Sequence, residues 1–231
     1  MLVAIHQPHY LPWLGYIDKV ARADCFVFLD TVNFTRGGWQ NRNYIHGPNG
    51  RQLLSVPVGH SGHSQALIDT KLSYVRDWRR KHFASILHNY ASSSYFDHFL
   101  ETVDAFYQNH WQSLADLGKH SCHHMFDLFC LKTISVNASD LGKIQQKKTA
   151  LLVEICRRLG ATQYLSGDGA NYLDLQLFEE AGIEVIRQNF IHPTYEQGDN
   201  SFTSHLAAWD VLFHLGLTGA RQRLGLTVAR S

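Results

Sequence analysis

The sequence predicts an α/β protein with a mostly parallel sheet covered by helices on both faces, a three-layer, Rossmann-like fold. Strand and helix patterns alternate in the N-terminal and C-terminal thirds of the chain, as they do in doubly wound folds. Residues 2–5 and 25–29 are short apolar runs, and residues 11–23 between them have apolar side chains at helical spacing. Such a strand–helix–strand unit implies parallel strands joined by a right-handed crossover. Further strands of this sheet are expected at residues 133–136, 163–165 and 184–186.

The middle third of the chain is predicted to be helical. Patterns at residues 77–90, 95–107 and 111–131 indicate a helical insertion or cap at about residues 75–131, packed on the sheet. Three later helices are expected to end at glycines, at residues 145–159, 172–181 and 207–215.

Several segments fall outside this alternation. Residues 53–58 and 66–72 are predicted as additional strands, and the polar, Gly-rich residues 31–49 as a long loop. No Pro/Gly/Ser-rich linker and no internal repeat divides the chain. We therefore expect one domain over residues 1–231, with a peripheral tail at 217–231.

Composition limits the classes of function. Lys and Arg total 21 against 20 Asp and Glu, a net charge of +1, which argues against nonspecific nucleic-acid binding and against docking on an anionic membrane by charge. The sequence contains no run of about eighteen apolar residues, the length needed to span a bilayer. The N-terminal residues lack a basic region and are predicted to be a strand, not a secretory signal. The four cysteines show no close pairing, so we expect reduced thiols and a cytoplasmic location.

The first polar segment follows the first predicted strand, where parallel sheets bind ligands. His6 is suited to proton transfer and Gln7 to orienting a carbonyl or hydroxyl group, and Tyr10 is a further candidate for substrate binding. A strand-to-helix turn with a satisfied histidine is the structural alternative. The 15 histidines and 12% aromatic residues suit a polar, aromatic-lined cleft, although drift in surface composition would give the same count.

The second polar segment follows the second predicted strand. Asp30 ends that strand and is expected to point into the same crevice as His6. The loop that follows offers guanidinium groups for a carboxylate or phosphate, an indole platform and two side-chain amides. These candidates are Arg36, Trp39, Gln40, Asn41 and Arg42, and a purely structural loop is the alternative.

Two later turns and one helix carry the remaining candidates. Ser166 and Asp168 lie in a Gly-rich turn between a strand and a helix, a site for an anion or hydroxyl group or an ordinary capped turn. Tyr195 and Gln197 stand two apart in a loop and would face one side, for binding or for packing. Lys81 and His82 are placed where a helix would reach the cleft. His120, His123 and His124 share a helical face but lack a patterned carboxylate, so we predict no metal site and no resident cofactor.

These segments resemble the WbqC-like protein family. Residues 6–16 read His-Gln-Pro-His-Tyr-Leu-Pro-Trp-Leu-Gly-Tyr, and residues 28–43 read Phe-Leu-Asp-Thr-Val-Asn-Phe-Thr-Arg-Gly-Gly-Trp-Gln-Asn-Arg-Asn. Shorter matches follow in order at residues 54–58, 164–167, 193–197 and 209–213. The resemblance implies a role in bacterial surface-polysaccharide (O-antigen, lipopolysaccharide) or natural-product biosynthesis. The implied reaction transfers an acyl or aminoacyl group to an amine.

Three hypotheses follow. The leading one is an acyl- or aminoacyltransferase that acts on an amino sugar or sugar nucleotide, with an acyl-carrier or peptidyl-carrier protein as donor. His6 would be the general base, and Asp30 would orient it or hold the ammonium. An amide of Gln7, Gln40 or Asn41 would steady the oxyanion, and Arg36 and Arg42 would hold phosphates of the donor or acceptor. The second is an ATP-dependent ligase or nucleotidyltransferase, because the first turn is similar to that of HUP-type Rossmann folds, whose His-x-Gly-His motif is not kept here. The third is a non-catalytic binding protein of a biosynthetic assembly.

Overall fold

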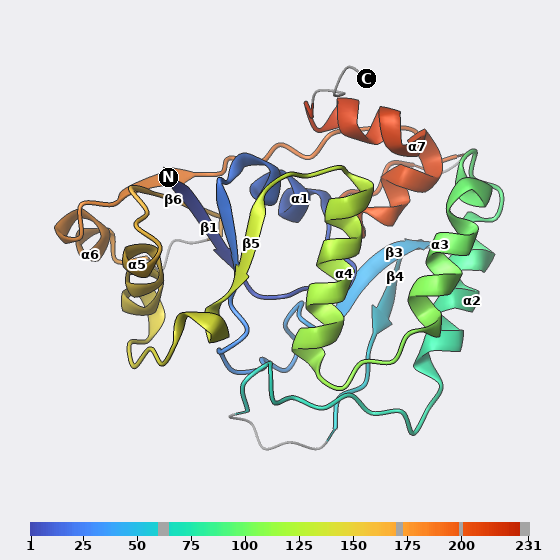
Figure 1. Ribbon diagram of the computed structural model, residues 1–231. Coiled ribbons are helices and arrows are strands. Elements are labelled where there is room, and N and C mark those ends of the chain that lie inside the picture. Colours follow the sequence, from blue (N-terminus) through green and yellow to red (C-terminus); the bar gives the residue numbers. More distant parts are fainter. Residues whose placement is uncertain (60–64, 170–172, 199–200, 227–231) are drawn as a thin grey trace.

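A five-stranded parallel sheet forms the centre of the computed structural model, which describes residues 1–59, 65–169, 173–198 and 201–226 (Figure 1). The strand order is β5-β2-β1-β6-β7, and every neighbouring pair is parallel. Counted along the chain, this is the order 3-2-1-4-5 of Rossmann folds, so the predicted fold class is confirmed. The strands are β1 (Leu2–His6), β2 (Cys25–Phe28), β5 (Ile134–Asn137), β6 (Gln163–Ser166) and β7 (Glu184–Arg187).

Helices cover both faces of this sheet because successive strand side chains point to opposite sides. Val3 and Ile5 pack in one core cluster with α5 (Lys148–Arg158) and α6 (Leu175–Glu180). Ala4 and Phe26 pack in the other cluster with α1 (Leu14–Arg22) and α4 (Leu114–Leu128). The two groups of helices lie on opposite sides of the sheet in Figure 1. The layers are therefore helix, sheet, helix.

The middle third contains the three predicted helices, but only the last lies directly on the sheet. The ring of Phe126 in α4 stacks on Phe28 of β2, with ring centroids 6.1 Å apart. Gly118 lets α4 approach the first turn, because a Cβ there would lie 2.7 Å from the Cβ of Pro8. The other two helices, α2 (Trp78–Tyr90) and α3 (Phe96–Gln108), pack on each other.

A β-hairpin occupies part of the segment that we expected to be a loop. Strands β3 (Arg42–Gly47) and β4 (Gly50–Ser55) pair antiparallel and form a second sheet beside α2. A two-residue turn joins them, and Gly50 has a φ of 97° that favours glycine. The prediction failed because the polar side chains of β3 hid its alternation, in which Asn43 and Ile45 are buried.

Two other predicted elements differ from the structure. Residues 66–72 do not form a strand; they make only isolated bridges, such as that between Val58 and Leu72. The last helix, α7 (Trp209–Arg223), does not end at Gly216 but kinks there, where φ is 65° and the Tyr95 ring lies against the glycine. Beyond the kink Ala220 is fully buried, so this part of the expected tail packs on the core. The first residues of the helix predicted at 172–181 lie partly outside the described residues; α6 begins at Leu175.

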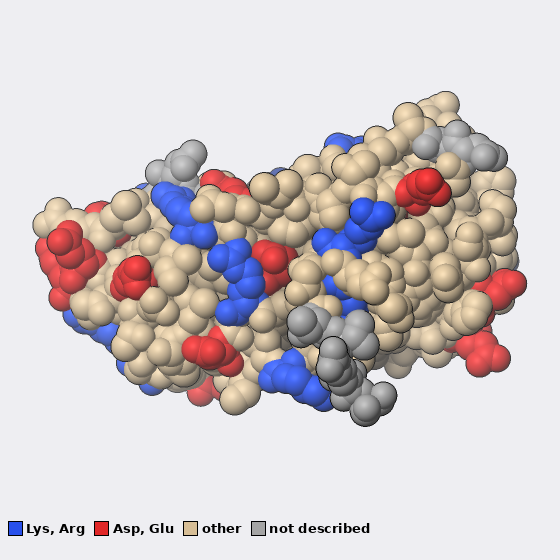
Figure 2. Space-filling model, turned by 90° about the horizontal axis from the view of Figure 1, so that it is seen from above, with Lys and Arg blue, Asp and Glu red and all other residues tan. Residues whose placement is uncertain are grey.

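Charges of both signs lie on the face seen in Figure 2. Lys and Arg side chains form a loose row across the middle of this face, and acidic side chains lie both beside this row and toward the two ends of the face. The described residues of this face therefore do not form the continuous basic surface of nucleic-acid-binding proteins. Among the described residues, no helix is both long enough and apolar enough to cross a membrane.

Candidate functional site

The strand order places the candidate site between the carboxyl ends of β1 and β6. The chain leaves β1 toward β2 on one side and leaves β6 toward β7 on the other, so the two connections diverge. Ligands of open α/β sheets bind at this switch point. His6 ends β1 and Ser166 ends β6, which brings the first and third predicted segments to the same edge.

His6 is a neutral base with a defined tautomer. Its Nδ1 lies 3.1 Å from the carbonyl oxygen of Gln7, which can only accept, so Nδ1 carries the proton and Nε2 is the basic nitrogen. The side chain is partly exposed, and no described residue bonds Nε2. Burial, followed by the charges of His9 and Lys19, lowers the pKa of His6 well below its usual value.

His9 stands beside His6 in the same turn. The ring centroids are 4.6 Å apart in an edge-to-face arrangement, and His9 is only 7% exposed. Burial, with a smaller effect of Lys19, lowers the pKa of His9 to about 4. His6 and His9 thus keep the spacing of the two histidines in a His-x-Gly-His turn, with Pro8 in the place of the glycine.

Lys19 is a member of the site that the sequence did not reveal. Sequence periodicity assigned it to the polar face of the first helix, whereas the structure leaves it 4% exposed. Its Nζ donates to the carbonyl oxygen of Ile5, 3.1 Å away, at the end of β1. Burial lowers the pKa of Lys19 to about 8, against an attraction from Asp168 that raises it. Lys19 is one of the buried residues of α1, although it lies outside the apolar stripe by which the sequence predicts the buried face of this helix.

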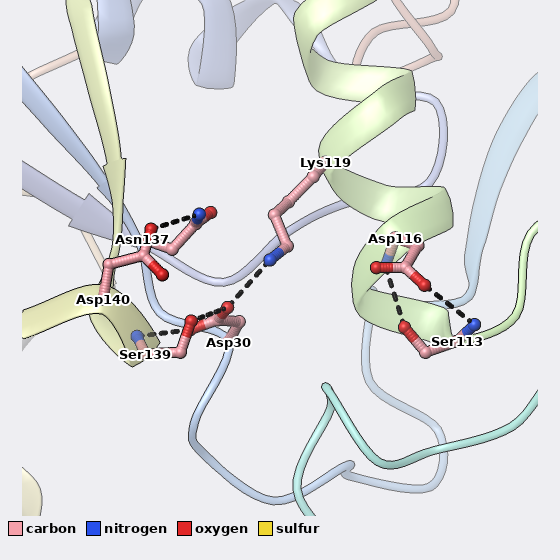
Figure 3. Close-up of polar contacts among 7 residues, drawn as sticks. All are labelled: Asp30, Ser113, Asp116, Lys119, Asn137, Ser139 and Asp140. Carbon is pink, nitrogen blue, oxygen red and sulfur yellow. Dashed lines mark hydrogen bonds and ion pairs between the residues drawn. The ribbon is translucent and has the colours of Figure 1, made fainter. Parts of the chain in front are cut away.

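Asp30 is held by partners other than His6 (Figure 3). Its carboxylate accepts from Lys119 Nζ at 2.8 Å and from the backbone nitrogen and hydroxyl of Ser139 at 3.0 and 2.8 Å. It is fully buried, and among the described residues no hydrogen bond joins it to His6. The ammonium that Asp30 holds is therefore that of Lys119, on α4; no motif or spacing in the sequence predicts this pair.

An amide pair links the first turn to the loop after β2. Gln40 Nε2 donates to Gln7 Oε1 at 2.8 Å, and the Tyr10 nitrogen donates to the Gln40 carbonyl oxygen at 3.1 Å. Gln40 is 2% exposed, and its Oε1 has no hydrogen-bond partner in the described part of the chain. Asn41 instead holds the backbone of Val56. The structure thus brings Gln7 and Gln40 together, as the candidate site requires.

An indole and a guanidinium border this amide pair. Trp39 is 45% exposed, and the guanidinium of Arg42 lies 5.4 Å from the centroid of its ring. Arg42 also donates to the carbonyl oxygen of Gly37, which limits its freedom to bind a ligand. Arg36 is exposed in the same loop. The platform is open to solvent, whereas Gln40 next to it is buried and Gln7 is half-buried.

Asp168 connects the ends of β6 and β7. Its two carboxylate oxygens accept from the backbone nitrogens of Asn189 and Phe190 at 2.7 and 3.1 Å. An open groove of about 560 Å³ lies here, lined by Asp168, Arg187, Asn189, Phe190 and Ile191. Asp168 therefore shapes this wall of the switch point and lies within electrostatic reach of the buried lysine.

Tyr10 and His82 lie in a buried cluster and not at an open surface. The Tyr10 hydroxyl bonds His82 Nδ1 at 2.8 Å and the Tyr107 hydroxyl at 2.7 Å. Burial lowers the pKa of His82 to about 4 and raises that of Tyr10. The cluster ties the first turn to α2 and α3, while Lys81 is exposed on α2.

Tyr195 and Gln197 both donate to the carboxylate of Asp210, a residue that was not among the predicted site residues. Asp210 is fully buried in the first turn of α7; its oxygens accept from Tyr195 Oη at 2.8 Å, Gln197 Nε2 at 2.7 Å and Tyr90 Oη at 2.8 Å. Asp210 lies in residues 209–213, one of the segments that resemble the family. Both predicted residues thus anchor the loop before α7.

The three histidines of α4 make aromatic contacts. His120 lies 5.5 Å from Trp111, and His123 lies 5.1 Å from Phe28, between ring centroids. Over the ranges that the structure describes, no group of three His, Cys, Asp or Glu side chains is arranged to hold a metal ion.

These features define a doubly wound α/β protein whose candidate ligand site lies at the switch point of a parallel sheet. The model of the WbqC-like protein family matches residues 7–222, which include every element from the first turn into α7. The chain therefore belongs to the WbqC-like protein family.

A relative in Mycobacterium tuberculosis (strain H37Rv), named Uncharacterized protein Rv1507c, is 29% identical over 217 residues, which cover 93% of this chain and 94% of the relative. No solved structure matches the chain significantly.

Proposed function

We propose that this protein is an acyl- or aminoacyltransferase that acylates an amine, with His6 as the general base. The observation that carries the proposal is the state of His6: its Nδ1 proton is directed to Gln7, its Nε2 is unbonded, and its lowered pKa keeps it neutral at pH 7. A neutral imidazole is the form that can accept a proton. It stands at the edge of the sheet where α/β proteins bind ligands.

The reaction requires no protein nucleophile. The amine nitrogen attacks the carbonyl carbon of a thioester, the new C–N bond forms, and His6 Nε2 takes the proton from the adduct. The C–S bond then breaks, and the proton passes from His6 to the departing thiolate. A weak base suffices because the ammonium of the tetrahedral adduct is far more acidic than that of a free amine. The Gln7–Gln40 amide pair lies next to this base and would orient the reacting carbonyl.

The substrate class follows from the walls of the site. Trp39, with Arg42 over its ring, offers an apolar face beside a cation, which suits an amino sugar or a sugar nucleotide as acceptor. The donor would be a thioester on an acyl-carrier or peptidyl-carrier protein. We place the reaction in surface-polysaccharide or natural-product biosynthesis, in the cytoplasm.

The test compares three forms of the full chain with a panel of carrier thioesters and nucleotide-linked amino sugars. Amide product is detected by mass spectrometry and released thiol by titration. We expect His6→Gln to lower turnover by roughly 10²–10⁴-fold. His88→Gln, a change on the exposed side of α2, is the matched control and should act like the wild type. Near-normal turnover in His6→Gln would remove His6 from the mechanism.

An ATP-dependent ligase or nucleotidyltransferase is the second candidate. It is favoured by the strand order and by two histidines three residues apart in the first turn. It requires that Mg-ATP bind to the protein, and calorimetry without heat at millimolar nucleotide would exclude it.

A further inference from the structure

Lys19 is a buried cation without a close negative partner. It is 4% exposed, and its Nζ donates to one carbonyl oxygen, that of Ile5. Within the described ranges it forms no salt bridge; Asp168 attracts it from beyond ion-pair distance. An ammonium group can donate three hydrogen bonds, and a buried charge without a counterion is costly. The fold keeps the ammonium here nonetheless.

Two imidazoles with unused nitrogens lie in contact beside this ammonium. His9 is 7% exposed, and neither of its ring nitrogens has a hydrogen-bond partner among the described residues. The two ring centroids are 4.6 Å apart, and Lys19 Nζ binds the carbonyl oxygen of Ile5, the residue that precedes His6. The charge of Lys19 lowers the pKa of both rings, in keeping with this geometry. The ammonium and the two imidazoles therefore form one cluster of nitrogen groups.

The turn after β6 borders Lys19 with a glycine. A Cβ at Gly167 would lie 3.9 Å from Lys19 Nζ, in ordinary van der Waals contact, so at this residue the turn presents backbone and no side chain to the ammonium. Asp168 follows, but both of its oxygens accept backbone hydrogen bonds from the β7 side. The acid closest to the cluster is therefore already engaged.

We propose that Lys19 and His9, beside the base His6, bind a phosphate group of the substrate at the switch point. This inference rests on the proposed function, because it takes the switch point as the site where the substrate binds. A dianion suits the cluster better than a carboxylate, because it would offset the ammonium and also favour protonation of an adjacent imidazole. Binding should therefore be accompanied by proton uptake. Among the described residues, Asp168 and the two imidazoles interact electrostatically with Lys19, and the Tyr16 ring packs 4.9 Å from His6 and 5.1 Å from His9 between ring centroids; the charges of these groups set the uptake.

The experiment is calorimetry on the full chain at pH 7 with inorganic phosphate and pyrophosphate. Two buffers of different ionisation enthalpy report the protons taken up. We expect wild type to bind pyrophosphate, Lys19→Met to bind it at least about tenfold more weakly, and the exposed-lysine control Lys132→Met to bind it like wild type. Equal binding by wild type and Lys19→Met, or no binding to wild type at millimolar pyrophosphate, would overturn the proposal.

A second measurement covers the case in which Lys19→Met does not fold. In the wild-type protein, histidine ring NMR should show the pKa of His9 rising when pyrophosphate is added, and an unchanged value would count against the site. Uridine diphosphate and phosphopantetheine, compared in the same titration, distinguish a nucleotide from a carrier arm as the source of the phosphate. Because no acyl transfer is measured, loss of phosphate binding and loss of the His6-dependent reaction are separate outcomes.

Discussion

Two polar clusters of the molecule differ in how their hydrogen-bonding atoms are used. The Asp210 cluster consists of Asp210 and the three side chains that bind it, and the switch-point cluster consists of Lys19, His6 and His9. Asp210 accepts three hydrogen bonds, from Tyr90, Tyr195 and Gln197, and the same glutamine also binds the backbone of Thr203. Every side-chain group that touches this carboxylate is a donor. Such saturation is typical of a buried polar group that stabilises a fold.

At the switch point the polar groups are bases, and most of their nitrogens are unpaired. Lys19 has one hydrogen bond, His6 has one, and the His9 ring has none within the described residues. Beside them, Gln40 Oε1 is buried without a hydrogen-bond partner in the described part of the chain; such groups call for an explanation, and functional sites are where they concentrate. The contrast separates an anchoring cluster from a candidate binding cluster, although the sequence offered site candidates in both: Tyr195 and Gln197 in the first and His6 in the second.

The largest effect on stability is expected at Asp210. Asp210→Ala removes the acceptor of two buried tyrosine hydroxyls and one of the two acceptors of Gln197 Nε2. Each lost hydrogen bond costs roughly 1–3 kcal/mol, so the free energy of unfolding should fall by at least about 3 kcal/mol. Urea denaturation measures it. Asp210→Asn retains the volume and one acceptor and should lie between this variant and wild type. A loss below about 1 kcal/mol would place Asp210 outside the anchoring role.

A smaller loss is expected when the Asp30–Lys119 pair is broken. Lys119→Met leaves the fully buried carboxylate without its cation, which in buried pairs costs roughly 3–5 kcal/mol. The lysine side chain is 18% exposed, so we expect about 2 kcal/mol. The double variant Asp30→Asn/Lys119→Met should recover part of this loss. Additive effects of the two changes would show that the ion pair itself contributes nothing.

Acid should weaken the native state through His9. Because the folded pKa is about 4 and the unfolded one about 6.5, the unfolded state binds more protons between these values, and stability falls as pH falls below about 6.5. The stability advantage of wild type over His9→Gln should shrink by about 2 kcal/mol between pH 7 and pH 5. His82→Gln should behave alike, since the pKa of His82 is also about 4. A pH-independent difference would mean that His9 is not protected from protonation.

The sequence predicted the parallel sheet because its strands are buried on both faces and read as continuous apolar runs such as residues 25–29. It also placed His6 and Gln7 at a strand end, because the apolar run of residues 2–5 stops just before them. It could not predict Lys19, whose burial depends on packing on both sides of α1, or the pairing of Asp30 with Lys119, which are 89 residues apart. The β3–β4 hairpin was missed because its turn and its polar strand look like loop.

The measurement that tests the central claim most directly is the free energy of unfolding of Lys19→Met. If Lys19 is kept for binding, removing its buried charge costs one hydrogen bond and relieves the desolvation that lowers its pKa, so stability should equal or exceed that of wild type. Phosphate binding should be lost in the same variant. A fall of about 2 kcal/mol or more, comparable to the loss in the Lys119 variant, would instead make Lys19 a structural group and contradict the account.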